Sequence, residues 1–153
     1  MMKAKDIMSK DVITVNPDTE IIQVAKLMLD NHYDGLPVVD KEGNLQGIIC
    51  QSDLMTQQQK IPIPSLFVLL DSVISFSYNK DIEKEVKKMA AVKVSEAMTP
   101  DPITVDPETS LEDIATLMVN HNIHTLPVLD KSRLVGIIGK EDIIRTLMST
   151  KGK

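Results

Sequence analysis

The chain has 153 residues, of which 42% are hydrophobic and 25% charged, and its formal net charge is −5. This composition is typical of a globular chain, and the lack of an uninterrupted basic cluster argues against nucleic acid as a partner. The single cysteine, Cys50, excludes an intramolecular disulfide and a cysteine-rich metal site. No segment reads as a signal peptide or membrane span, so we expect a cytoplasmic protein without a membrane partner.

The first half of the chain predicts a strand, a helix and a hairpin. Residues 12–15 are a β-branched run closed by Asn16 and Pro17, which is typical of a short strand. A helix with one apolar face should follow, with Asp18 or Thr19 as its N-cap. Residues 36–39 and 45–50 have strand length and are joined by a turn at 40–44. Residues 52–54 then resemble the start of a second helix.

The segment at 59–92 interrupts this pattern. We expect residues 57–64 to form an extended connector, because their two prolines stop a helix. Residues 65–76 concentrate apolar side chains, and residues 81–91 predict an amphipathic helix. Two interpretations stay open: the insertion either covers a sheet edge as a lid or forms a subunit contact.

The second half repeats the first. Residues 8–19 return as 98–109, an offset of 90, and residues 47–49 return as 136–138, an offset of 89. The lost residue falls at the predicted hairpin tip, where a deletion is tolerated. Thr109 and Glu112 have capping-box spacing. Each copy thus predicts a β-α-β-β-α unit, which at about 50 residues buries too little alone. The copies should pack through their sheets around an approximate two-fold axis, leaving two equivalent clefts.

The tandem pattern resembles a pair of cystathionine-β-synthase (CBS) domains, known as a Bateman module. It is carried by the proline-bounded first strand, the Leu-Pro-Val segments and the Gly-Ile-Ile-x-x-x-Asp motifs, all present twice. The resemblance implies an α+β fold with repeats at 3–58 and 93–148. It also implies a regulatory module that binds an adenosine-containing ligand (AMP, ADP, ATP or S-adenosylmethionine) and forms a homodimer.

The ribose-binding motif implied by the resemblance ends at Asp53 in one copy and Asp142 in the other. A carboxylate can accept both hydroxyls of a cis-diol, although an acid in a first helical turn also complements the helix dipole without any ligand. The motif's hydroxyl position holds Cys50 and Gly139. The candidate ligand-binding residues are Met8, Ile13, Tyr33, Asp34, Ile48, Cys50, Asp53, Met98, Ile103, Ile123, His124, Thr125, Ile137, Gly139, Lys140 and Asp142.

The resemblance also divides these residues between two clefts. The cleft of Asp142 should take its base-side wall from Ile13, Tyr33 and Asp34. The cleft of Asp53 should take its wall from Ile103, Ile123 and His124. On charge, His124 favours a phosphorylated ligand in the second cleft, whereas Asp34 would repel an anion in the first.

Other side chains near the clefts have simpler interpretations. The simpler interpretation of His124, a partly exposed histidine at a strand start, is favoured over a phosphate contact. For Lys140 and Arg145, exposed basic residues on a helix, we expect solvation rather than a phosphate contact. His121 and His124 lack a carboxylate or cysteine partner, so we predict no metal site.

The sequence bears on three functions: enzyme, nucleotide sensor and structural module. No nucleophile triad, phosphate loop or zinc motif is present, so the sequence predicts no enzyme. A nucleotide sensor that signals to a sister subunit or an unidentified effector protein is favoured. A structural dimerisation module without physiological ligand is the alternative, because both motif hydroxyls are replaced.

Overall fold

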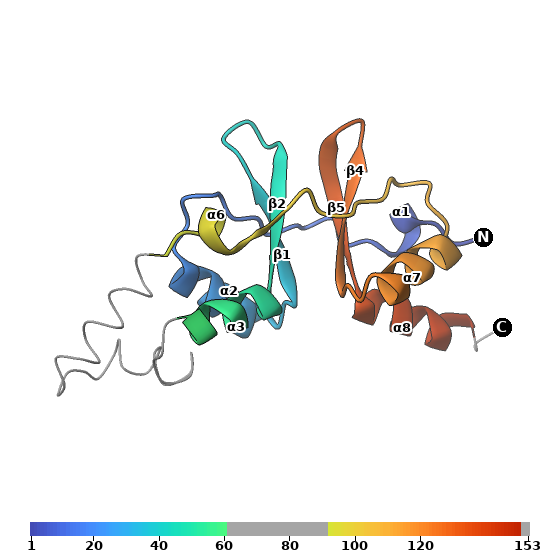
Figure 1. Ribbon diagram of the computed structural model, residues 1–153. Helices are drawn as coiled ribbons and strands as arrows, with labels where there is room; N and C mark the ends of the chain where they lie inside the picture. Colours follow the sequence, from blue (N-terminus) through green and yellow to red (C-terminus); the bar gives the residue numbers. More distant parts are fainter. Residues whose placement is uncertain (61–91, 151–153) are drawn as a thin grey trace, which may run out of the picture.

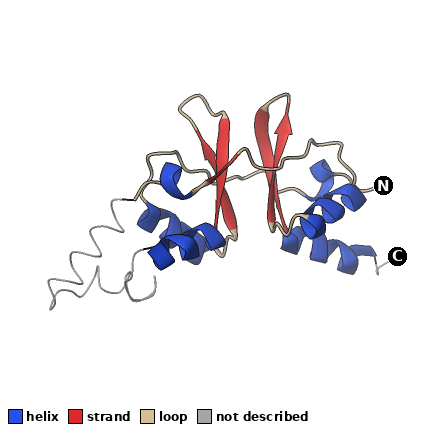
Figure 2. Cartoon of the chain, viewed as in Figure 1, coloured by secondary structure: helices blue, strands red, loops and turns tan. Residues whose placement is uncertain are grey.

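A computed structural model describes residues 1–60 and 92–150. Two β-hairpins lie side by side at the centre, and helices cover the outer side of each (Figures 1 and 2). This confirms the predicted α+β fold of two repeats packed through their sheets. The elements of the first half are α1 Ala4–Ile7, α2 Ile21–Asn31, β1 Gly35–Val39, β2 Leu45–Cys50 and α3 Gln51–Lys60. Those of the second are α6 Val94–Ala97, β3 Thr99–Pro100, α7 Leu111–Asn120, β4 Thr125–Asp130, β5 Arg133–Gly139 and α8 Lys140–Thr150.

The two hairpins have the same register and differ at their tips. Leu36 pairs with Ile49 in one, and Leu126 pairs with Ile138 in the other. The longer tip is organised by Asp40, whose carboxylate accepts the backbone N–H groups of residues 42 and 44, both at 2.9 Å. The shorter tip turns at residues 131 and 132, with φ of 51° and 71°, as a two-residue hairpin turn requires. The one-residue deletion therefore lies at a hairpin tip, as predicted.

The predicted first strand is much shorter than expected. Within residues 12–15 only Val15 pairs, in a parallel bridge to Val38, and Val105 forms the equivalent bridge to Val128. The physical reason is the turn that follows at once: the Asn16 carboxamide accepts the N–H of Asp18 at 2.9 Å. The parallel direction agrees with a crossover connection, but the ladder ends after one residue.

Both predicted N-caps are wrong. Helix α2 begins after Glu20, which makes no side-chain cap bond, and α7 begins after Ser110, whose hydroxyl accepts the N–H of Asp113. The hydroxyls of Thr19 and Thr109 instead accept backbone N–H groups three residues earlier, each at 3.1 Å. These threonines therefore close the turn before the helix, which competes with capping.

The connector predicted at 57–64 is wrong for residues 57–60, and residues 61–64 lie outside the described part of the chain. Helix α3 continues to Lys60, because a proline at 62 limits the helix only near its own position and that of the preceding residue. The predicted apolar segment at 65–76 and amphipathic helix at 81–91 lie outside the described residues.

The two repeats exchange their N-terminal segments. Helix α1 packs beside α7 and α8, whereas α6 packs beside α2 and α3 (Figure 1). The backbone N–H of Ala4 donates to the carbonyl of Thr109, and that of Val94 donates to the carbonyl of Thr19, both at 2.8 Å. Ala4 is fully buried in the core of the second repeat and Val94 in the core of the first.

Candidate functional site

A cavity of about 260 Å³ lies between the two repeats. Its volume is near the lower end of small-molecule sites, which span roughly 300–1,000 Å³. The first repeat contributes Ser9, Asp11, Val12, Ile13 and residues 31–36, and the second contributes Thr125, Ile137, Arg145 and residues 139–142. The cavity thus unites Asp142 with Ile13, Tyr33 and Asp34 from the other repeat, the combination expected for the first cleft. We call this cavity the Asp142 cleft.

Each motif aspartate occupies the third position of a helix and caps it. Asp142 Oδ2 accepts the backbone N–H of Gly139, and Asp53 Oδ2 accepts that of Cys50, both at 2.8 Å. These bonds are the reverse half of a capping box. The aspartates therefore stabilise their helices without any ligand, but each carboxylate oxygen can accept more than one hydrogen bond. Capping and ribose binding are compatible at this position.

The hydroxyl position of the motif is the N-cap of the same helices. Gly139 and Cys50 each directly precede the first helical residue, where serine or threonine would normally cap. A Cβ on Gly139 would have no protein atom nearer than 3.8 Å, so a serine there has room. At Cys50, burial, followed by the charges of Asp53 and Asp34, raises the thiol pKa to about 11. Cys50 is therefore a neutral thiol at physiological pH.

Two basic side chains line the Asp142 cleft and remain largely exposed to solvent, Lys140 by 48% and Arg145 by 66%. Lys140 Nζ lies 3.7 Å from Asp34 Oδ2, which forms an ion pair between the repeats. Arg145 Nη1 donates to Asp142 Oδ1 at 3.0 Å, and Arg145 Nη2 lies 3.7 Å from Glu141. The spacing of Arg145 three residues after Asp142 is the sequence signal that could have placed it here.

The prediction also missed several residues of the cleft. His32 ends α2 in the left-handed conformation, with φ of 57°, and lies in the cavity wall next to Tyr33. Ser9 and Asp11 belong to the exchanged N-terminal segment, and Ser9 bridges to Ile137 of β5. Met8, a predicted ligand contact, packs against Gly136. A Cβ added to Gly136 would lie 2.5 Å from the Met8 sulfur, which is too close for a side chain at this position.

The residues predicted for the second cleft are placed differently. Asp53 Oδ1 accepts a hydrogen bond from the Thr99 hydroxyl at 3.3 Å. At the equivalent Asp142, Oδ1 instead accepts a hydrogen bond from Arg145. His124 is exposed, and its carbonyl accepts the N–H of Lys140 at 3.0 Å. Of this predicted set, only Thr125 lines the Asp142 cleft. The remaining members are Ile48, which is buried, and Cys50, Met98, Ile103 and Ile123, which are half-buried.

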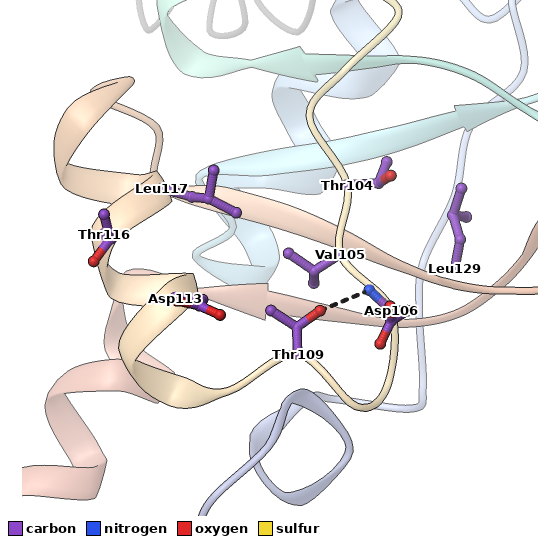
Figure 3. Close-up of a pocket in the computed structure, with 8 residues that line it drawn as sticks. All are labelled: Thr104, Val105, Asp106, Thr109, Asp113, Thr116, Leu117 and Leu129. Atoms are coloured by element: carbon purple, nitrogen blue, oxygen red, sulfur yellow. Dashed lines mark hydrogen bonds between the residues drawn. The ribbon is translucent and has the colours of Figure 1, made fainter.

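A separate, larger groove of about 560 Å³ lies beside the N-terminal half of α7 (Figure 3). Its polar groups already serve the local turn: Thr109 accepts the N–H of Asp106, and Asp106 accepts the N–H of Glu108 at 2.7 Å. The lining holds no cation and no aromatic ring. A groove also accompanies the same turn in the first repeat, where Lys26 and Lys41 belong to the lining. Because a groove recurs at this turn in both repeats, we attribute both grooves to the repeated turn.

Within residues 1–60 and 92–150, no group of three or more histidine, cysteine or acidic side chains is placed to hold a metal ion. The same residues contain no helix with the length and hydropathy needed to cross a bilayer.

Comparisons with known proteins identify the family. The CBS-domain family model matches residues 4–60 and 94–149. The uncharacterized protein MJ1426 of Methanocaldococcus jannaschii is 32% identical over 97% of this chain and 92% of its own length. Other relatives are enzymes that contain such a region, including inosine-5′-monophosphate dehydrogenase of the same organism, where the match covers 23% of the enzyme.

Solved structures of related folds contain adenosine ligands. CBSX2 in complex with AMP is 25% identical, with a TM-score of 0.72 over 99% of both chains; CBSX2 is an Arabidopsis thaliana protein. The CBS domain pair of MJ0100, in complex with 5′-methylthioadenosine and S-adenosyl-L-methionine, is 28% identical, with a TM-score of 0.70 over 98% of both chains. The chain therefore belongs to the CBS-domain family and consists of two CBS domains in tandem, a Bateman module.

Proposed function

We propose that this protein is a non-catalytic sensor that binds an adenosine-containing ligand in the Asp142 cleft. The observation that carries the proposal is the cavity in which Asp142 of one repeat faces Ile13 and Tyr33 of the other. In this arrangement the carboxylate holds the ribose hydroxyls while the apolar side chains enclose the adenine. The related CBS pairs bound to AMP, methylthioadenosine and S-adenosylmethionine support this ligand class.

The location of the cleft suggests how binding is transmitted. Because its walls belong to different repeats, a ligand that prefers one inter-repeat arrangement shifts the population toward it. A sister subunit or an effector protein then reads the changed geometry. No step of this mechanism requires bond chemistry, in keeping with relatives that are named only as CBS-domain-containing proteins.

We expect a homodimer, as the family resemblance implies. Large apolar side chains are exposed on α3 and α8, the helices that follow the two motifs: Met55, Ile144 and Met148 are 69%, 58% and 76% exposed. Their burial against a second copy would remove this surface from water. The structural-module alternative uses the same surface without a ligand. A cytoplasmic location also stays a proposal, since the related CBSX1 of Arabidopsis thaliana is chloroplastic.

The test is ligand-dependent thermal stability with a matched pair of variants. At 100 times its dissociation constant, a ligand adds roughly 2.7 kcal/mol to the free energy of unfolding. Asp142→Asn keeps an oxygen for the Gly139 cap but removes the charge, and should cost on the order of 1.5 to 3 kcal/mol of binding free energy. Asp53→Asn makes the same change at the equivalent helix position, outside the cleft. The proposal fails if adenosine ligands produce no shift in the wild type, or if both variants lose binding equally.

A further inference from the structure

The charges around the Asp142 cleft discriminate among adenosine ligands. Four carboxylates line the cavity, against two permanent cations. The carboxylates belong to Asp11, Asp34, Glu141 and Asp142, and the cations to Lys140 and Arg145. A ligand phosphate placed here adds negative charge to a wall that already carries an excess of it.

Both cations are also paired with carboxylates in this structure. Lys140 lies 3.7 Å from Asp34, and Arg145 contacts Asp142 at 3.0 Å. A phosphate that recruited either cation would share it with a carboxylate partner, and that carboxylate would stay beside the phosphate in the same small cavity. The Asp34 side chain is only 29% exposed, so its charge is weakly screened by solvent compared with a surface group.

The second repeat shows that this arrangement is not required by the fold. The position equivalent to Asp34 holds His124, and the position equivalent to Lys140 holds Gln51. The backbone contact at these positions is the same in both repeats: the Asp34 carbonyl accepts the N–H of Gln51 at 3.1 Å, and the His124 carbonyl accepts that of Lys140 at 3.0 Å. The fold therefore accepts a residue other than aspartate at this point.

From these observations we infer that the Asp142 cleft selects adenosine ligands without negative charge at the 5′ position, and that Asp34 sets this preference. The inference rests on the proposed function, because it specifies the ligand class of the same site. The 5′ substituent of 5′-methylthioadenosine is a neutral thioether, and that of S-adenosylmethionine has a net positive charge from its sulfonium, ammonium and carboxylate groups. Neither adds net negative charge beside Asp34, whereas the phosphates of AMP and ATP add it.

The experiment compares 5′-methylthioadenosine with AMP, which differ at the 5′ substituent. The chain has no tryptophan and two tyrosines, Tyr33 and Tyr78. In a Tyr78→Phe background, tyrosine fluorescence reports Tyr33 alone, which lines the cleft. We expect methylthioadenosine to bind about tenfold more tightly than AMP. A tenfold difference in affinity is about 1.4 kcal/mol, the order of magnitude of the repulsion between the AMP phosphate and the Asp34 carboxylate when solvent partly screens them.

Three variants in this background complete the test. Asp34→Asn should erase most of the tenfold preference by strengthening AMP binding, and Asp34→His, which installs the residue of the second repeat, should do the same. Asp18→Asn removes an equal charge at an exposed position outside the cleft and should leave the preference unchanged.

The outcomes separate this inference from the proposed function. If neither ligand changes Tyr33 fluorescence or thermal stability, the proposed function fails. If both bind but AMP binds as tightly as methylthioadenosine in the wild type, the inference is overturned and the proposed function stands. An equal effect of Asp18→Asn and Asp34→Asn also overturns the assignment to Asp34.

Discussion

Val94→Ala tests the exchange of N-terminal segments. Val94 is fully buried in the core of the first repeat, although it belongs to the second repeat in sequence. Removing two methyl carbons costs about 1.6 kcal/mol in lost transfer free energy, and an unfilled cavity adds a further contribution of similar size. We therefore expect a loss of roughly 2 to 3 kcal/mol in the free energy of unfolding.

The distribution of that loss is more informative than its size. Because each repeat contributes part of the other's core, both should unfold in a single transition, and amide exchange should accelerate equally in β2 and β5. Urea unfolding followed by circular dichroism gives the size, and hydrogen exchange by mass spectrometry gives the distribution. Val119→Ala, the same change at a side chain that is 79% exposed, should stay within about 0.5 kcal/mol of the wild type.

The reasoning is refuted if Val94→Ala leaves the urea midpoint unchanged. It is equally refuted if exchange accelerates in β2 while β5 keeps its full protection, because the second repeat would then be stable without the first.

Three further predictions concern single positions. Gly139→Ser supplies the missing N-cap hydroxyl of α8, and there is room for the new side chain. The variant should raise the free energy of unfolding by about a few tenths of a kcal/mol, which is measured as a higher urea midpoint. A lower midpoint contradicts the cap assignment. Hydrogen bonds from lysine side chains lower the pKa of Glu108 to about 2. Since the pKa in the folded state lies below that in the unfolded state, the ionised Glu108 stabilises the fold above about pH 4.5, and this stabilisation is lost as the pH falls toward about 2. Urea midpoints of the wild type and Glu108→Gln should therefore differ at pH 7 and converge near pH 2, and a constant difference refutes the assignment. His32 has left-handed backbone, and the equivalent position of the second repeat holds Asn122, whose φ is 50°. His32→Asn should therefore raise the free energy of unfolding by about a few tenths of a kcal/mol. A fall in the thermal midpoint contradicts this prediction.

The sequence predicted the features that depend on local spacing. The hairpins, the position of the deleted residue and the place of Asp53 and Asp142 at helix starts follow from strand length, turn residues and helical spacing. The grouping of Asp142 with Ile13 and Tyr33 followed from the resemblance and the two-fold relation of the copies. The short first strand was missed because β-branched residues favour extension but do not supply a partner for every residue.

The exchange of N-terminal segments could not be predicted from the sequence. In a duplicated chain, residues 4–7 and 94–97 carry the same pattern, so either segment fits either core, and only the connecting geometry decides between them. The Lys140 ion pair escaped prediction for a different reason, because its partner Asp34 belongs to the opposite repeat. The Arg145–Asp142 pair lies within α8, and its three-residue spacing was a local signal that the prediction did not use.

The exchange also places the first and the last described helix in the same half of the molecule. Helix α1 lies beside α7 and α8, and α8 is the last described helix (Figure 1). A pair of fluorescent dyes, one on α1 and one on α8, would therefore keep a constant separation during any hinge motion between the halves. A dye on either of these helices combined with one on the β1–β2 tip would register that motion directly.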